Sequence, residues 1–349
     1  MKRIFSAVLT LAMVLALAGC GQAAPASSDA ASQSQAASSQ AGSQQETAPQ
    51  EAYSARIGGL KGPTTLGMLK LAQDVADDAT PNDWQVEMYG AADEIVPLLT
   101  KGELDMAAIP ANLAATLYNK TEGKVQVAAI NTLGVLYVVT TGDEINSVED
   151  LRGMTVYSTG KGTTPEFVLR HILEKNGMDP DKDLTLEYLS EATEVLAHIQ
   201  ASSGPAVAVL PQPYVTAAQM QVEGLKVALS LTEEWDKVSP DSALITGILA
   251  VRSEFAAEHP EAVQAFLQEY QASVDYVNSH VEEAAQWAES MGVVAKAAIA
   301  QKAIPACNIV YQAGEEMKSA LSGYLQVLFD QDPKAVGGAL PEDNFYYGV

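Results

Sequence analysis

Cysteine is scarce in this chain of 349 residues, which contains only Cys20 and Cys307. Cys20 lies in the N-terminal export segment described below, so Cys307 is left alone and no intrachain disulfide is expected. No motif around Cys307 indicates a nucleophile. We therefore predict that Cys307 is a buried thiol.

Positive charge is scarce as well. The 20 Lys and Arg residues stand against 44 Asp and Glu residues, and the formal net charge is −24 at pH 7. Because nucleic-acid binding depends mainly on the neutralisation of phosphates, we exclude nucleic acid as a partner. The acidic balance favours solubility and does not identify a small ligand.

Catalytic and metal-binding motifs are missing. The four histidines form no His-Glu-x-x-His zinc pattern, and no Gly-x-Ser-x-Gly elbow is present. The glycine-rich segment at 157–165 lacks the spacing of a phosphate-binding P-loop. Ser158 and Lys161 match the Ser-x-x-Lys pair of penicillin-interacting enzymes, but no Lys-Thr-Gly follows them. The sequence therefore predicts no catalytic residue, no metal site and no cofactor.

Apolar runs long enough to span a membrane are absent too. The N-terminal run, Ile4 to Leu17, follows Lys2 and Arg3 and leads into Ala18-Gly19-Cys20. Such a charged start, short apolar run and small residues are typical of an export signal. Cysteine directly after Leu-Ala-Gly resembles a bacterial lipobox, so we predict a lipoprotein signal peptide over residues 1–19 and lipidation of Cys20. The protein would then be extracytoplasmic, anchored to the bacterial cell membrane. The alternative is a plain secretory signal.

The segment after the signal has an unusual composition. From Gly21 to Gln50, 23 of 30 residues are Ala, Ser or Gln, and Leu, Ile, Val and aromatic residues are absent. Such a segment cannot bury enough apolar surface to offset the entropy lost on ordering. We predict a disordered tether over residues 20–52, and periodic apolar sequence begins at Tyr53.

Short β-like runs alternate with helical patterns through most of the remaining chain. The runs at 104–109, 154–157 and 206–210 are each followed by a helical pattern. This rhythm predicts an α/β fold with mostly parallel sheets and helices on both faces. After Arg252 the pattern is almost entirely helical.

Two strand-rich regions, near 125–141 and near 225–251, interrupt the rhythm. Long β segments that pass between two α/β units are what a two-lobed protein with a double crossover requires. We place one crossover near Thr140 and the return near Thr246. Lobe one would then comprise residues 53–139 and 246–349, and lobe two residues 140–245.

Glycine, hydroxyl and aromatic residues gather where strands are followed by helices. In open parallel sheets, ligands bind at these strand ends, because glycines allow close approach and helix N–H groups are free to donate. For residues 58–65 the alternative interpretation is an ordinary turn with a threonine N-cap. The predicted ligand-binding residues are Lys61, Gly62, Thr64, Thr65, Tyr89, Asp93, Pro110, Asn112, Tyr137, Ser158, Thr159, Gly162, Thr163, Thr164, Glu191, Gln212 and Tyr214.

Several of these segments resemble a known family. The lipobox, the polar tether, Gly59-Leu60-Lys61-Gly62-Pro63-Thr64-Thr65 and Gly102-Glu103-Leu104-Asp105-Met106-Ala107 are similar to solute-binding proteins of ABC importers. Residues 150–156 and 210–214 add further matches. From Tyr53 to about Gln271 the chain most resembles the branch that includes alkanesulfonate, taurine and nitrate binders and binders of thiamine pyrimidine precursors.

The resemblance implies a type II periplasmic-binding fold that closes two lobes on a small molecule. It also implies ABC permease and ATPase subunits as partners, with the membrane reached through the lipid on Cys20, and we expect a monomer. The cysteine-rich motif of the related pyrimidine synthase is absent, so we expect a binding protein and no enzyme. The alternatives are a surface-tethered enzyme and a ligand sensor that uses the same fold.

The chemical class of the ligand stays open between two types. Lys61 and Lys161 favour a sulfonate-like anion. Asp93, Glu94 and the tyrosines favour a pyrimidine- or flavin-type heterocycle, because they offer hydrogen bonds and stacking surfaces.

Overall fold

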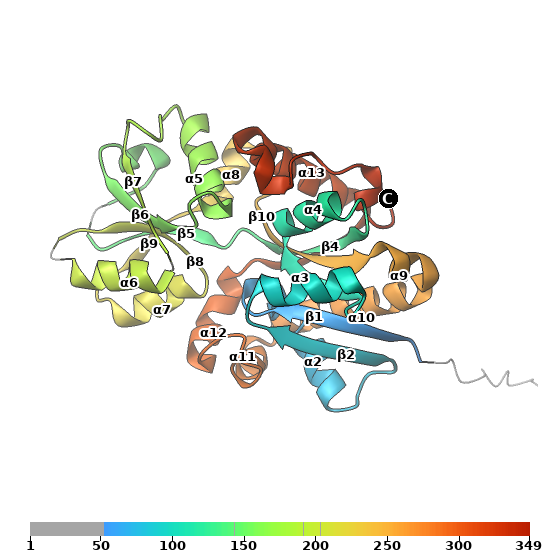
Figure 1. Ribbon diagram of the computed structural model, residues 1–349. Coiled ribbons are helices and arrows are strands. Elements are labelled where there is room, and N and C mark those ends of the chain that lie inside the picture. Colours follow the sequence, from blue (N-terminus) through green and yellow to red (C-terminus); the bar gives the residue numbers. More distant parts are fainter. Residues whose placement is uncertain (1–51, 143, 191, 203) are drawn as a thin grey trace, which may run out of the picture. The chain divides into compact units, whose positions relative to one another are not determined.

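The structure is a computed structural model that describes residues 52–349, apart from residues 143, 191 and 203 (Figure 1). The predicted signal peptide, Cys20 and nearly all of the predicted tether lie outside the described residues, as does Glu191. The described part contains two β-sheets flanked by helices, which confirms the predicted α/β class.

The first sheet has six strands in the order β11-β4-β10-β3-β1-β2. β1 runs parallel to β2 and β3, whereas β10 runs antiparallel to both β3 and β4. β11 is antiparallel to β4 at the edge. The strands are β1 (Ser54–Leu60), β2 (Asp83–Tyr89), β3 (Met106–Pro110), β4 (Val125–Leu133), β10 (Ile245–Arg252) and β11 (Ile309–Gln312).

The second sheet has five strands in the order β7-β6-β8-β5-β9. β6 runs parallel to β7 and β8, whereas β5 runs antiparallel to β8 and β9. The prediction of mostly parallel sheets is therefore wrong, because the strands that carry the chain between the sheets run against their neighbours. The strands are β5 (Leu136–Thr140), β6 (Thr155–Thr159), β7 (Thr185–Leu189), β8 (Val207–Pro211) and β9 (Lys226–Ser230).

The first passage between the two sheets lies several residues before the expected position near Thr140. The expected boundary between residues 139 and 140 falls inside β5, which pairs within the second sheet along its whole length, so the passage is the short link at Gly134 and Val135. The return link follows Val238 and leads into β10 at Ile245. We propose a division into lobe one, residues 52–133 and 245–349, and lobe two, residues 136–244.

The two links lie against each other, and this closeness explains a glycine. A Cβ atom on Gly134 would lie 2.8 Å from Cγ of Leu244 and closer still to the Thr232 hydroxyl of α8 (Leu231–Val238), and packed atoms do not tolerate such distances. The carbonyl oxygen of Gly134 also accepts a hydrogen bond from Asn308 Nδ2 at 2.6 Å. The outgoing link thus packs against the returning link and is also hydrogen-bonded to lobe one.

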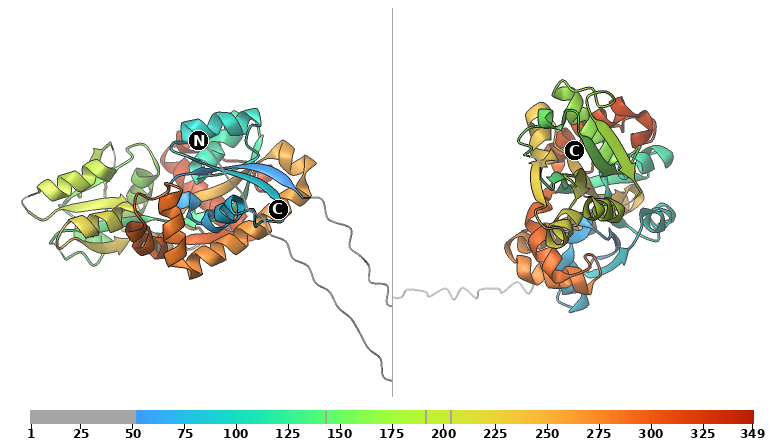
Figure 2. Two further views of the ribbon diagram at one scale, coloured as in Figure 1. Left: turned by 90° about the horizontal axis from the view of Figure 1, so that it is seen from below. Right: turned by 90° about the vertical axis from the view of Figure 1, so that its left-hand side faces the viewer.

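Helices cover both faces of each sheet (Figures 1 and 2). Along β10, Ile248 and Ala250 face one core cluster and Leu249 and Val251 the other, as the period of two in a strand requires. Lobe one contains α1 (Pro63–Leu66), α2 (Leu69–Ala76), α3 (Ala92–Lys101), α4 (Ala111–Lys120), α9 (Ser253–Glu258), α10 (Pro260–Ser279), α11 (Val281–Ser290), α12 (Ala297–Ala303) and α13 (Gly314–Gln331). Lobe two contains α5 (Thr164–Lys175), α6 (Ala192–Ala201), α7 (Tyr214–Gln221) and α8 (Leu231–Val238).

One apolar core joins the two lobes on the side of α13. The ring of Tyr324 on α13 lies 5.7 Å from the ring of Trp235 on α8, and both side chains are fully buried. His171 on α5 packs 4.8 Å from Trp235, and its Nε2 lies 2.7 Å from the Ser239 hydroxyl. Burial lowers the pKa of His171 to about 4 from its ordinary value of 6.5.

This burial generates a prediction for stability against pH. His171 is neutral in the folded state and protonates near pH 6.5 when unfolded, so its stabilising contribution is complete above pH 6.5 and is lost as the pH falls toward 4. We expect His171→Gln to reduce the difference in unfolding free energy between pH 7.5 and pH 4.5 by about 1–3 kcal/mol. Urea unfolding followed by tryptophan fluorescence measures it. The exposed His259, changed to Gln, is the control, and an equal effect of both variants would contradict the prediction.

Candidate functional site

A pocket of about 370 Å³ lies between the two lobes, and we call it the interlobe pocket. Five segments line it: the loop after β1, the link at Val135, the turn from β8 into α7, the start of β10 and the segment between α11 and α12. Its lining residues are Lys61, Gly62, Pro63, Val135, Pro211, Gln212, Pro213, Tyr214, Ala217, Thr246, Val293, Val294, Ala295 and Ile299.

The loop after β1 forms one side of the pocket. Gly62 has a φ of 135°, in a region that favours glycine, and Pro63 then starts α1. The hydroxyls of Thr64 and Thr65 both donate to the carbonyl oxygen of Leu60, at 3.2 and 2.6 Å, and both side chains are buried. These hydroxyls therefore brace the loop, while Lys61, Gly62 and Pro63 face the pocket.

Lys61 is the cation of the interlobe pocket. Its Nζ lies 3.4 Å from the position that a Cβ on Gly292 would take, so it lies beside the segment that follows α11. Lys61 makes no ion pair with any residue that the structure describes. An amine without a carboxylate partner can bind an anionic or carbonyl oxygen of a ligand.

The turn from β8 into α7 forms the side that belongs to lobe two. Gln212 is buried, and its Oε1 accepts hydrogen bonds from the Thr216 hydroxyl and backbone at 2.9 and 3.3 Å. This leaves its Nε2 without a partner among the described residues. Tyr214 begins α7 with 40% of its surface exposed, so its ring is available for stacking.

Apolar residues from lobe one complete the wall. Val293, Val294 and Ala295 precede α12, and Ile299 lies on it. α12 also contacts α7 of lobe two, beside the pocket. The site is thus a largely apolar pocket with four side chains that carry a polar group, Lys61, Gln212, Tyr214 and Thr246, which is the usual construction of a small-molecule site.

The predicted glycine-rich loop of lobe two is held by its own helix. Glu166 Oε2 accepts from the backbone N–H of Gly162 at 2.6 Å, and its Oε1 accepts from Arg170 Nε at 2.9 Å. The Thr163 hydroxyl donates to the carbonyl oxygen of Gly160 at 2.6 Å. Within residues 158–164, Ser158, Thr159, Gly162, Thr163 and Thr164 contribute nothing to the interlobe pocket lining, and their ligand contacts stay predictions.

Five further predicted residues also lie outside the pocket lining. The Tyr137 hydroxyl donates to the carbonyl oxygen of Ala306 at 2.8 Å, which links β5 to lobe one, and the Tyr89 hydroxyl donates to Glu87 at 2.6 Å. Burial raises the pKa of both phenols to about 12. Asp93 is exposed in the first turn of α3, and Pro110 and Asn112 are half-buried at the start of α4.

Four of the predicted residues are brought together in the pocket: Lys61, Gly62, Gln212 and Tyr214. Sequence reasoning missed Val135, Thr246 and the wall at 293–299. Residues 293–299 carried no sequence signal of a binding site, because a short apolar stretch between two helical patterns is typical of an ordinary hydrophobic core. Thr246 was noticed only as a crossover position.

Other chemical features are sparse in the part of the chain that the structure describes. There, no three His, Cys, Asp or Glu side chains are grouped to hold a metal ion, and no helix is long and apolar enough to cross a membrane. Cys307 is a free, buried cysteine, as predicted, and burial raises the pKa of its thiol to about 12.

Comparisons with known proteins bear on this geometry. A family model described as NMT1/THI5 like matches residues 83–284. A Brucella abortus protein named as a binding protein is 28% identical over 188 residues, which cover 54% of this chain and 55% of the relative. The match thus spans about half the length of the curated relatives.

Solved structures share the fold over most of the chain. The structure of an ABC transporter from Parabacteroides distasonis has 26% identity and a TM-score of 0.69, covering 84% of this chain and 98% of its own. The periplasmic aliphatic sulphonate binding protein of Escherichia coli has 16% identity and a TM-score of 0.65, and the match covers 82% of this chain and 90% of that protein. These neighbours are periplasmic-binding-protein structures, so the predicted fold and the family resemblance are confirmed.

The buried thiol gives a prediction for chemical reactivity. In a Cys20→Ser variant of the full chain, we expect Cys307 to react with Ellman's reagent at pH 8 about 100-fold more slowly than after unfolding in guanidinium chloride, because a thiol with a raised pKa forms little thiolate. The absorbance of the released thiolate follows the reaction. Comparable rates in the folded and unfolded protein would contradict the burial of Cys307.

Proposed function

The chain belongs to the NMT1/THI5-like family, and we propose that it is the solute-binding component of an ABC importer. In this proposal the protein captures a small organic molecule between its lobes and delivers it to a membrane permease. The observation that carries the proposal is the interlobe pocket, which takes Lys61 from one lobe and Gln212 and Tyr214 from the other.

The chemistry of the pocket supports a small, partly apolar ligand with one polar or anionic group. The volume of about 370 Å³ is near the lower end of the usual range for small-molecule sites, about 300–1,000 Å³. Lys61 would bind the anionic or carbonyl oxygen, the Gln212 amide would donate a second hydrogen bond, and the Tyr214 ring would cover an apolar or planar body. Both a sulfonate-like anion and a pyrimidine- or flavin-type heterocycle meet these conditions.

Capture would use a hinge at the two links, near Gly134 and Leu244. On the α13 side the lobes share the buried core around Trp235 and Tyr324, which opposes separation there. On the other side, α12 contacts α7 beside the pocket, where Ile299 of α12 and Ala217 of α7 both belong to the lining. We therefore propose that opening and closing occur mainly between α12 and α7.

The cellular setting of the proposal rests on the N-terminal sequence and on the relatives. Its expected partners are an ABC permease with its ATPase subunits, because structural neighbours are ABC import binding proteins. Lipid on Cys20 would anchor the monomeric protein outside the cytoplasm, with residues 20–52 as the tether.

Ligand binding gives the first test. Mass spectrometry of small molecules released from gently purified protein, and thermal shifts with panels of alkanesulfonates and aminopyrimidines, identify a ligand. Once one is found, we expect Lys61→Met and Tyr214→Ala each to weaken binding by about 1–2 kcal/mol in calorimetry, because each removes one polar or stacking contact.

Lys101→Met, at the end of α3 outside the interlobe pocket, is the matched control and should leave affinity unchanged. Affinity that survives both pocket variants would place the ligand elsewhere. Chemical conversion of the bound ligand by the purified protein would contradict a role in binding alone.

The anchor gives the second test. We expect Cys20→Ala to move the protein from the membrane fraction to the soluble fraction of cells, because the acceptor of the lipid is lost. Immunoblots of both fractions after a high-salt wash measure the change. Retention of the variant with the membranes would refute lipid anchoring at Cys20.

A further inference from the structure

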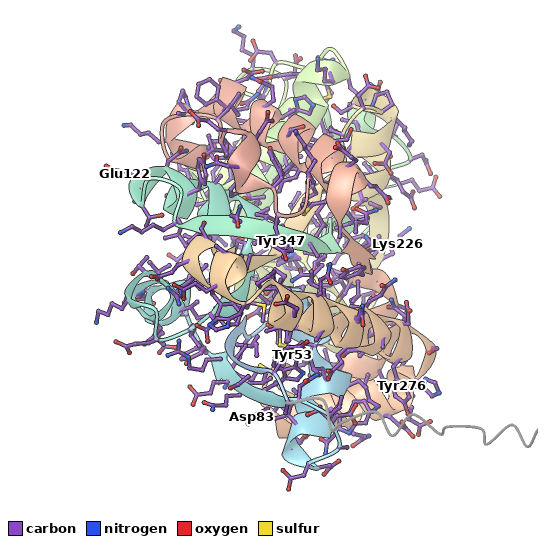
Figure 3. All side chains as sticks on the ribbon, turned by 90° about the vertical axis from the view of Figure 1, so that its right-hand side faces the viewer. Tyr53, Asp83, Glu122, Lys226, Tyr276 and Tyr347 are labelled. Carbon is purple, nitrogen blue, oxygen red and sulfur yellow. The ribbon has the colours of Figure 1, made fainter. Side chains whose placement is uncertain are left out.

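A second pocket in lobe one has a different chemistry from the interlobe pocket and shares no residue with it. It has a volume of about 320 Å³ and lies between α10, β11, the start of α13 and the C-terminal residues. We call it the α10 pocket, defined by Gln264, Gln268, Gln271, Tyr311, Gly314 and Tyr347. Figure 3 views this side of the protein, with Tyr347 labelled close to α10.

Gln264, Gln268 and Gln271 of the α10 pocket are exposed, and Tyr311 and Tyr347 are half-buried. No hydrogen bond joins the glutamine amides or the two tyrosine hydroxyls to another described residue, so these groups are open to water and to a ligand. The three glutamines are spaced at i, i+4 and i+7, so their amides follow one face of α10. They offer a row of paired donors and acceptors to a ligand.

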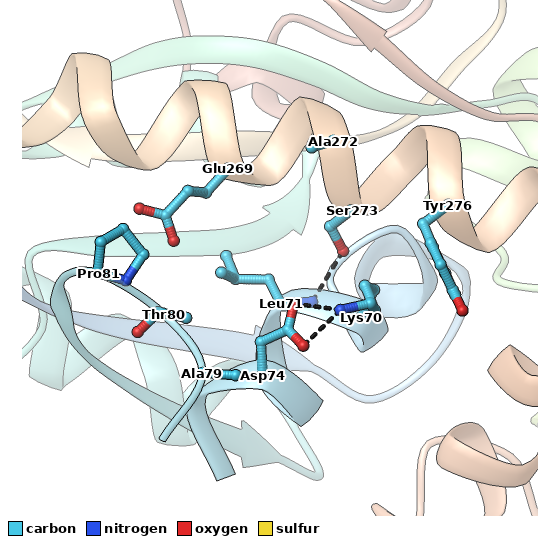
Figure 4. A pocket seen from close by; sticks show the side chains of 10 residues that line it. All are labelled: Lys70, Leu71, Asp74, Ala79, Thr80, Pro81, Glu269, Ala272, Ser273 and Tyr276. Carbon is cyan, nitrogen blue, oxygen red and sulfur yellow. Dashed lines mark hydrogen bonds and ion pairs between the residues drawn. The ribbon is translucent and has the colours of Figure 1, made fainter. Parts of the chain in front are cut away.

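A neighbouring pocket of about 300 Å³, between α2 and α10, shows the opposite situation (Figure 4). There Lys70 pairs with Asp74, and Ser273 accepts from the N–H of Leu71 at 3.0 Å. Glu269 accepts from Trp84 Nε1 at 2.9 Å and from Asn82 Nδ2 at 2.6 Å. A ligand there would have to break existing bonds, whereas in the α10 pocket it would not.

The ring of Tyr311 and the backbone of Tyr347 are each held by a contact with lobe one. The ring of Tyr311 packs edge-on against the buried Tyr270, with 6.3 Å between the ring centroids. The backbone N–H of Tyr347 donates to the carbonyl oxygen of Val127 at 2.9 Å. Burial raises the pKa of both phenols, so they stay protonated and can donate. Rigid aromatic side chains lose little entropy when they bind a ligand.

The lining of the α10 pocket carries no charged side chain, although the net charge of the whole chain is −24. Glu315 and Glu316 occupy the first turn of α13, directly after Gly314, and satisfy the positive end of that helix dipole. Glu261 lies near enough to contribute to the raised pKa of Tyr347, so carboxylates on several sides of the pocket would repel an anion. The side chains that a ligand would contact directly are the neutral amides and phenols of the lining, which suit an uncharged ligand.

We infer that the α10 pocket binds a neutral saccharide. Neighbouring hydroxyls of a sugar both donate and accept, as the glutamine amides do, and the C–H face of a pyranose ring can pack against a tyrosine ring. This site is separate from the proposed ligand site between the lobes and does not depend on it. It would attach lobe one to a polysaccharide without using the interlobe pocket.

The experiment is a titration of the isotope-labelled full chain with maltotriose, followed by protein-observed NMR. We expect saturable shifts in α10, β11 and the C-terminal residues. Gln268→Ala and Tyr347→Ala should each weaken this binding at least about tenfold. The matched control is Gln286→Ala, an exposed glutamine on α11 outside the α10 pocket, which should stay within about twofold of the unchanged protein.

Three outcomes would overturn the inference. They are the absence of saturable shifts with maltotriose, equal affinity in the Gln268→Ala variant, and saturable binding of triglycine without binding of maltotriose. Tyr214→Ala separates the two sites. If it abolishes maltotriose binding while Gln268→Ala does not, the sugar occupies the interlobe pocket and the α10 site is refuted.

Discussion

The pairing of β10 with β3 and β4 is the constraint on which the rest of the structure depends. β10 lies between these two strands in the middle of the first sheet, but it follows lobe two in the chain. Without it, the inner edges of β3 and β4 would leave buried backbone N–H and C=O groups unpaired, which is costly. Lobe one can therefore be completed only after the chain has returned from lobe two.

This return has a geometric consequence for the site. Because β4 leaves the first sheet beside the strand that re-enters it, both links lie at one end of the sheet, where Gly134 packs against Leu244. Two adjacent links restrict relative motion of the lobes to a hinge more than one link would. They also bring Val135 and Thr246 into the interlobe pocket beside Lys61 and Gln212.

Polar groups at the strand ends divide into those that hold loops and those that stay free. The Thr64 and Thr65 hydroxyls donate to a backbone carbonyl of their own loop, and Glu166 accepts from a backbone N–H of the loop before its helix. The Lys61 amine and the Nε2 of Gln212 make no hydrogen bond to a described residue, and both side chains line the pocket. The buried Thr64, Thr65 and Glu166 thus have local partners. The exposed Lys61 and the unpartnered Nε2 of Gln212, in contrast, are free to bind a ligand.

The sequence by itself determined the alternation of strands and helices, because hydrophobic periodicity and helix starts are local properties. Pro63 and Pro165 mark the first turns of α1 and α5, and the expected runs at 154–157 and 206–210 correspond to β6 and β8. The sequence also identified the strand-end loops that contain Lys61 and Tyr214, two residues of the interlobe pocket. Local patterns do not specify strand direction or sheet membership. They placed β segments where β5 and β10 lie without their antiparallel direction, and they missed the short edge strand β11.

Only the tertiary structure decided which of the predicted ligand-binding residues lie together in one pocket. Residues 293–299 lie more than two hundred positions beyond Lys61, yet they form the wall beside it, because α11 and α12 pack at the end of the first sheet near α7. The threonine hydroxyls had the right chemistry for a ligand, and their hydrogen bonds to Leu60 became visible only in the folded loop. Sequence specifies which groups are present, whereas long-range packing decides which of them keep a free hydrogen-bonding atom.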